Sequence, residues 1–135
     1  VSQIRDSFTD QVVVTPVVSM KREGKTFLFN PPAQGSSALE IKAALPETAK
    51  LVSAYHNLPA AELSEIDKTL DYDVVICGDD EGAKGVVKKI TEDIPNLRVL
   101  DAGSLEVSAM IESMTPLIVN LNVRYKPQHF SVKFV

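Results

Sequence analysis

Short apolar segments alternate with segments of helical periodicity along most of this chain. Four apolar runs, at residues 11–18, 50–56, 73–77 and Arg98–Asp101, have the length and composition of buried strands. Helical patterns lie between the later runs, and this alternation predicts an α/β fold with a largely parallel sheet. Residues 20–35 contain clusters of glycine and proline, so we expect an irregular loop there.

Two helices are predicted between the strands. The first begins at Ser37, because Ser37 and Glu40 have the S-x-x-E spacing of a capping box, and it ends near Pro46. The second follows Asp79 and Asp80, which suit an N-cap and a first helical turn. Its buried face is expected to hold five apolar residues at helical spacing: Ala83, Val86, Val87, Ile90 and Ile94. A further short helix is expected within residues 60–70.

A long apolar helix is predicted from Leu105 onward. Its apolar residues recur at helical spacing: Val107, Met110, Ile111, Met114, Leu117, Ile118 and Leu121. Each contributes roughly 1.5–3 kcal/mol if fully buried, so we expect this stripe to cover a core, a second subunit or both. We therefore expect a homodimer formed through residues 105–123. Glu112 is expected in a salt bridge or in solvent, and the alternating residues 130–135 predict a terminal strand.

Composition and charge narrow the class of protein. The 135 residues are enough for a hydrophobic core, and 44% hydrophobic and 24% charged residues are typical of globular proteins. The formal net charge of -4 is opposite to that of a typical nucleic-acid binder. No segment approaches the roughly 20 apolar residues of a membrane span. Cys77 is the single cysteine. We expect a cytoplasmic protein without nucleic-acid or membrane partners.

The residues that follow the strands form the candidate site. Ligands of open α/β sheets bind outside the carboxyl ends of strands. His56 and Asn57 follow the second strand, and Pro59 prevents further strand pairing. Thr15 and Pro16 mark another strand end. The alternative for His56 is a structural histidine that hydrogen-bonds to a backbone carbonyl group.

Other kinds of chemistry have little support in the sequence. Gly78, Gly82 and Gly85 have the spacing G-x3-G-x2-G, which differs from the dinucleotide fingerprint and is also explained by a capped helix start. Neither a P-loop nor a G-x-S-x-G motif occurs. The two histidines and the cysteine share no metal-ligand spacing. The sequence therefore predicts neither a catalytic triad nor a metal site.

An ordered set of motifs gives a more specific prediction. VVVTPVVSM, HNLPA, CGDD, and LDAGSL followed by ESMTPL occur in this order. Together they resemble the carboxyl-terminal two-thirds of the NADP oxidoreductases that use a hydroxy-deazaflavin, coenzyme F-420. The resemblance covers essentially all 135 residues. It implies an oxidoreductase that transfers a hydride between NADPH and the deazaflavin.

The resemblance also implies a set of cofactor-binding residues. Those expected around the deazaflavin are His56, Asn57, Leu58, Pro59 and Phe130, while Thr15 and Pro16 would lie where the nicotinamide and deazaflavin rings meet. No catalytic side chain is expected, because direct hydride transfer needs mainly proximity and orientation.

The same resemblance implies a particular domain organisation. Residues 1–35 would be the last part of a Rossmann-type parallel sheet, and residues 36–135 a small α/β domain for deazaflavin binding and dimerisation. The glycine fingerprint for NADP is missing, so we expect a truncated chain with weak or no activity alone. Two alternatives remain: a flavin- or ferric-reductase-like NADPH enzyme of the same fold, and a non-catalytic oligomerisation module.

Overall fold

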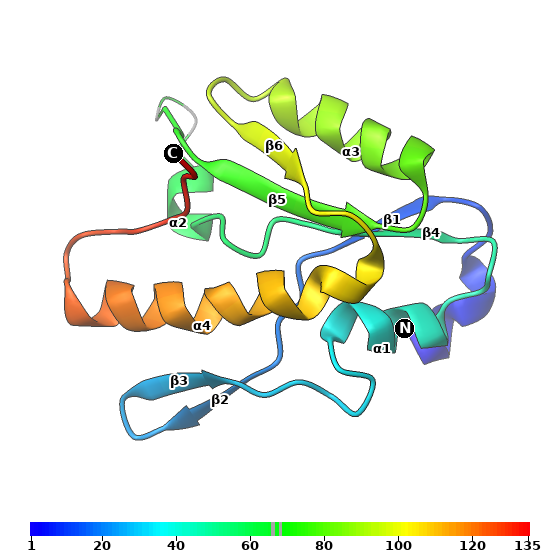
Figure 1. Ribbon diagram of the computed structural model, residues 1–135, viewed down its shortest axis with the longest axis horizontal. Helices are drawn as coiled ribbons and strands as arrows, with labels where there is room; N and C mark the ends of the chain where they lie inside the picture. Colours follow the sequence, from blue (N-terminus) through cyan, green and yellow to red (C-terminus); the bar gives the residue numbers. More distant parts are fainter. Residues whose placement is uncertain (66, 68) are drawn as a thin grey trace.

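The computed structural model describes residues 1–65, 67 and 69–135 and confirms the predicted α/β fold (Figure 1). A four-stranded sheet has the order β1-β4-β5-β6. Its strands are β1 (Val12–Thr15), β4 (Lys50–Ser53), β5 (Asp73–Gly78) and β6 (Arg98–Asp101). A separate hairpin consists of β2 (Met20–Glu23) and β3 (Thr26–Phe29). The helices are η1 (Ser2–Ser7), α1 (Ser37–Ala44), α2 (Ala60–Leu63), α3 (Glu81–Glu92), η2 (Leu105–Val107) and α4 (Ser108–Arg124).

The sheet is parallel except at its centre. β1 pairs with β4 and β5 pairs with β6 in parallel, whereas β4 and β5 are antiparallel, with Val52 opposite Gly78 and Ser53 opposite Cys77. A parallel neighbour would require a crossover, usually a helix, over one face of the sheet. The described part of the β4–β5 connection contains only the four-residue α2. As a result, β1 and β4 end at one edge of the sheet, and β5 and β6 end at the opposite edge.

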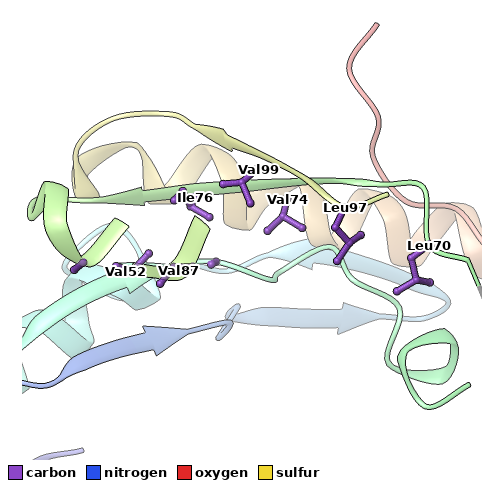
Figure 2. Close-up of a cluster of buried hydrophobic side chains, with 9 residues drawn as sticks. Val52, Leu70, Val74, Ile76, Val87, Leu97 and Val99 are labelled. Carbon is purple, nitrogen blue, oxygen red and sulfur yellow. The ribbon is translucent and has the colours of Figure 1, made fainter. Parts of the chain in front are cut away.

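Helices cover both faces of this sheet. α3 lies on one face, and α1 and α4 lie on the other (Figure 1). Successive residues of β5 point to opposite faces. Val74 and Ile76 therefore belong to the cluster with Val87 of α3, shown in Figure 2, while Val75 and Cys77 belong to the cluster with α1 and α4.

The predicted division at residue 35 remains a prediction. β1 lies before this position and β4 after it, and the two strands are direct neighbours in one sheet. In the described residues, no helix is long and apolar enough to cross a membrane.

The start of α1 differs from the predicted capping box by one residue. The N-cap is Ser36, whose hydroxyl accepts a hydrogen bond from the backbone N–H of Leu39 at 3.1 Å. Ser37 is already inside the helix and buried. The prediction was wrong because neighbouring serines give two overlapping cap patterns, and S-x-x-E favoured the second.

The predicted buried face of α3 is only partly correct. Asp80 is the N-cap, as expected, and accepts from the N–H of Ala83 at 2.7 Å. Ala83 and Val87 are buried, but Val86, Ile90 and Ile94 are exposed. The buried positions on α3 are Ala83, Lys84, Val87 and Thr91, because a single sheet covers only a narrow stripe of this helix.

The predicted loop at residues 20–35 contains the β2–β3 hairpin instead. Glu23 pairs with Thr26 across a two-residue turn, where Gly24 has a φ of 62°. The side chain of Asn120 on α4 binds both backbone groups of Phe27, accepting from its N–H and donating to its carbonyl, each at 2.8 Å. A residue far along the chain therefore stabilises this hairpin, which local sequence patterns do not reveal.

The apolar stripe of α4 is divided between core and surface. Ile111 and Ile118 are buried, whereas Met110 and Leu117 are 72% and 58% exposed. Residues 130–135 do not form the predicted terminal strand. They make one backbone hydrogen bond with β5, from the N–H of Asp73 to the carbonyl of Val132. Of the helix predicted within residues 60–70, Ala60–Leu63 is helical, and residues 66 and 68 lie outside the described part.

Candidate functional site

A cavity of about 170 Å³ lies at the end of β4. Three segments line it: the turn that follows β4, the carboxyl-terminal half of α4, and the segment after α4. The lining residues are His56, Asn57, Leu58, Pro59, Thr115, Ile118, Val119, Asn122 and Phe130. The structure therefore brings together five of the residues expected at the deazaflavin, which the sequence separates by more than half of the chain.

The turn after β4 has a constrained backbone. Tyr55 has a φ of 70°, which is unusual for a bulky residue, and its hydroxyl group is hydrogen-bonded to Thr91 Oγ1 at 2.6 Å. The hydroxyl of Thr115 donates to the carbonyl of His56 at 3.1 Å and ties the turn to α4. Pro59 then caps α2. Contacts with α3 and α4 thus fix the direction in which the chain leaves the sheet.

His56 is buried, with 7% of its surface exposed. Its Nε2 lies 2.9 Å from the hydroxyl of Ser53, and its Nδ1 has no hydrogen-bond partner in the structure. Burial lowers the pKa of His56 below 6.5, and the negative charge of Glu112 only partly opposes this shift. The ring is therefore neutral at physiological pH. The alternative that its ring bonds to a backbone carbonyl is wrong, because the partner is a serine hydroxyl.

Asn57 connects the turn to the sheet and to the chain end. Its Nδ2 donates to the carbonyl of Asp73 at 2.9 Å and to the hydroxyl of Ser131 at 3.3 Å. Its Oδ1 is buried and has no hydrogen-bond partner among the described residues. Because buried polar atoms are usually hydrogen-bonded, two such atoms on adjacent lining residues suggest that a ligand satisfies them.

The segment after α4 closes the cavity. The N–H of Phe130 donates to Asn122 Oδ1 at 2.6 Å, and its ring packs edge-on against Tyr125 with centroids 5.8 Å apart. Leu58, Ile118 and Phe130 supply apolar walls. The arrangement suits a flat, largely apolar group with hydrogen-bond donors at one edge.

Thr15 and Pro16 are not among the residues that line this cavity. Thr15 is buried opposite Ser53, its carbonyl accepts from the N–H of Ala54, and its hydroxyl accepts from the N–H of Val17 at 3.2 Å. Pro16 is exposed. Both residues lie at the same edge of the sheet as His56, at the end of the neighbouring strand.

A larger cavity, of about 470 Å³, lies near the start of β4 and the end of β5. Its polar groups include Lys42 and Asp79, which form an ion pair with each other, and Asp79 also accepts from the N–H of Leu105. These groups already have partners, so we take the smaller cavity as the candidate site. Across the described ranges, no group of three or more His, Cys, Asp or Glu residues is placed to hold a metal ion.

Sequence reasoning missed the contribution of α4 to the site. Thr115, Ile118, Val119 and Asn122 have the spacing i, i+3, i+4, i+7, which places them on one face of the helix. The available signal was the presence of two polar residues, Thr115 and Asn122, seven positions apart and therefore on one face of the helix. Glu112 was also misplaced: it is fully buried rather than exposed or in a salt bridge among the described residues.

A partly polar cavity lies at a strand end of this α/β sheet, which is the place where ligands of such sheets bind. The predicted resemblance is confirmed by curated F420-dependent NADP reductases. The chain is 35% identical over 136 residues to the Methanocaldococcus jannaschii enzyme, covering 98% of this chain and 60% of that protein. It is 27% identical over 135 residues to the Methanothermobacter thermautotrophicus enzyme, covering 98% and 58%. The chain thus spans about 60% of the length of these relatives. No model of a known protein family matches it.

Solved structures show the same fold. A candidate F420-dependent NADP reductase from Arthrobacter sp. FB24 matches with a TM-score of 0.78 and 19% identity, over 96% of this chain and 61% of that one. The hypothetical protein SMa0349 from Sinorhizobium meliloti matches with a TM-score of 0.59 and 23% identity, over 83% and 55%. At these identities, the matches establish the fold alone.

Proposed function

We propose that this chain is the deazaflavin-binding part of an oxidoreductase that transfers a hydride between NADPH and coenzyme F-420. The observation that carries this proposal is the convergence of His56, Asn57, Leu58, Pro59 and Phe130 on one cavity. These are the residues that the resemblance assigns to the deazaflavin. The named activity of relatives that match 98% of the chain supports the same reaction.

The cavity fits one edge of a deazaflavin. His56 Nδ1 and Asn57 Oδ1 are buried acceptors without partners among the described residues, and each has less than 1 Å² of accessible surface. Ring N–H or O–H groups would satisfy them once the lining side chains shift to admit the ring edge. The volume of about 170 Å³ is below the roughly 300–1,000 Å³ of complete small-molecule pockets. The cavity therefore takes one end of the ring system, and the rest extends beyond it.

The bound coenzymes would supply the hydride donor and acceptor. The chain itself would bind and orient the deazaflavin and exclude water from it. Leu58, Ile118 and Phe130 contact the flat ring, while His56 and Asn57 set its position through hydrogen bonds at its edge. Such positioning is worth roughly 7–11 kcal/mol in reactions between two bound partners. This division of roles needs no protein nucleophile.

Thr15 and Pro16 belong to the nicotinamide side of this proposal. They end the strand next to β4, so a second ring located beside them would approach the deazaflavin from β1. Binding of NADP is proposed for the whole protein, because this sequence lacks the glycine fingerprint.

Isothermal titration of the protein with oxidised coenzyme F-420 tests the proposal. We expect binding that weakens about tenfold in His56→Ala, because one buried hydrogen bond to the ring is lost. Glu47→Ala is the matched control, since Glu47 lines the larger cavity near the start of β4. No binding of the deazaflavin would contradict the proposal, and equal or tighter binding of riboflavin-type cofactors would favour the flavin-reductase alternative.

A further inference from the structure

A buried chain of polar side chains leads from His56 into the protein. Ser53 Oγ lies 2.9 Å from His56 Nε2 and 2.6 Å from Ser108 Oγ, and Ser108 Oγ donates to Glu112 Oε2 at 2.7 Å. Ser53, Ser108 and Glu112 are fully buried. This series of hydrogen bonds crosses from β4 to α4. It ends at a carboxylate that the proposed hydride transfer does not require.

Glu112 is held at the first turn of α1. Its Oε1 accepts from the N–H of Ser37 at 2.8 Å, and its Oε2 accepts from the N–H of Ala38 at 3.4 Å. Both carboxylate oxygens thus act as hydrogen-bond acceptors, toward two backbone N–H groups at the helix start and toward the hydroxyl of Ser108. Glu112 therefore fixes the direction of every hydrogen bond in the chain.

The donor and acceptor of each hydrogen bond can be derived in turn, starting from Glu112. The hydroxyl of Ser108 must donate to Glu112, so its oxygen accepts from the hydroxyl of Ser53. The oxygen of Ser53 then accepts from His56, whose proton must be on Nε2. In the neutral ring this leaves Nδ1 as a bare acceptor, and Nδ1 is the ring atom that has no partner within the described part of the chain.

We propose that Glu112 is a positioning residue that acts through Ser108 and Ser53 to hold His56 in the Nε2–H tautomer, so that Nδ1 accepts a hydrogen bond from an N–H or O–H group of the ligand. The ligand part of this inference rests on the proposed function, whereas the tautomer does not. This tautomer also determines specificity. A ligand that places a hydrogen-bond acceptor against Nδ1 is rejected, because the two acceptors cannot bond to each other.

Glu112→Gln should reverse the donor and acceptor roles along this series of hydrogen bonds. Its amide oxygen takes the position that faces the N–H of Ser37 at 2.8 Å, because an amide nitrogen opposes that donor more strongly than it opposes the N–H of Ala38 at 3.4 Å. The amide nitrogen then faces Ser108 and donates to it. Ser108 donates to Ser53, Ser53 donates to His56 Nε2, and the proton of the ring moves to Nδ1.

Long-range ¹H–¹⁵N correlation spectra of the histidine rings, at about pH 8 where the neutral form predominates, distinguish the two tautomers. His129→Gln assigns the two histidines. We expect Nε2–H for His56 in the unchanged protein and Nδ1–H in Glu112→Gln. Ser108→Ala breaks this series of hydrogen bonds and should give both tautomers. Ser113→Ala should change nothing, because the exposed hydroxyl of Ser113 donates to the carbonyl of Met110.

Finding His56 as Nδ1–H in the unchanged protein would overturn the inference, and this result does not depend on whether any variant folds. An unchanged tautomer in a folded Glu112→Gln would overturn the role of Glu112.

In the same spectra, oxidised coenzyme F-420 should shift the Nδ1 resonance, and Glu112→Gln should bind it at least about tenfold more weakly. Binding that leaves Nδ1 unshifted would refute its role as acceptor. No binding of the coenzyme would instead refute the proposed function and leave the tautomer result standing.

Discussion

The carboxylate of Asp73 offers a test of how the chain end is held against the sheet. Asp73 is 1% exposed and accepts three hydrogen bonds: from Arg98 Nε at 2.8 Å, from Arg98 Nη2 at 2.6 Å and from the N–H of Phe134 at 2.6 Å. Hydrogen bonds to a charged group contribute about 1.5–3 kcal/mol each. The Arg98 side chain is 53% exposed, so water partly replaces its bonds, and we expect Asp73→Ala to lower the free energy of unfolding by about 3 kcal/mol.

Asp71→Ala is the matched control for this prediction. Asp71 also binds the chain end, through Lys133, but the two side chains are 65% and 47% exposed. Exposed ion pairs contribute about 0.2–1 kcal/mol, so the control should lose less than a third as much stability as Asp73→Ala. Urea denaturation of both variants measures the difference. Equal losses, or a loss below about 0.5 kcal/mol for Asp73→Ala, would refute the reasoning.

The pH dependence of stability gives a second readout of the same site. Hydrogen bonds from Arg98 are the main cause that lowers the pKa of Asp73 below 3.8 in the folded protein, against the opposing effect of burial. The unfolded state therefore binds the proton more readily. The stability that this carboxylate contributes is present above about pH 4 and is lost as the pH falls through the folded pKa. In Asp73→Ala this part of the acid-induced loss should be missing.

Three other predictions are tested by changing single residues. Asn120→Ala removes both hydrogen bonds to Phe27 and should cost about 1–2 kcal/mol, with faster hydrogen exchange confined to the β2–β3 hairpin; unchanged exchange there would contradict this role. Gly78→Ala places a Cβ 3.0 Å from the carbonyl oxygen of Leu51 and should destabilise by about 1–3 kcal/mol in thermal unfolding, whereas a neutral effect would show that β4 and β5 separate easily. The predicted homodimer through α4 should sediment as a dimer and become monomeric in Leu117→Glu, and a monomeric unchanged protein would refute it.

The strands were predictable because their signals are local. The run from Val74 to Cys77 is apolar and buried on both faces, and such a run predicts an internal strand without knowledge of its neighbours. The direction of β5 relative to β4 was not predictable in this way, since it depends on the path of the connecting chain. For this reason, the sequence did not reveal that β5 and β6 end at the edge of the sheet opposite to the ends of β1 and β4.

The candidate site was predictable where it follows a strand. His56 and Asn57 were identified by their place at the end of β4, and Phe130 only by the resemblance. Glu112 could not be placed from the sequence, because its backbone partner Ser37 lies 75 positions away. A glutamate within a largely apolar helix can be exposed to solvent or buried against hydrogen-bond donors. Which of the two occurs depends on where the start of α1 lies, and the sequence does not give that position.

A crystal structure of the protein with oxidised coenzyme F-420 tests the proposed site most directly. We expect the deazaflavin ring to lie between Leu58 and Phe130, with its edge within about 3.2 Å of His56 Nδ1 and Asn57 Oδ1. A ring located in the cavity beside Lys42 and Asp79, at the opposite edge of the sheet, would contradict it.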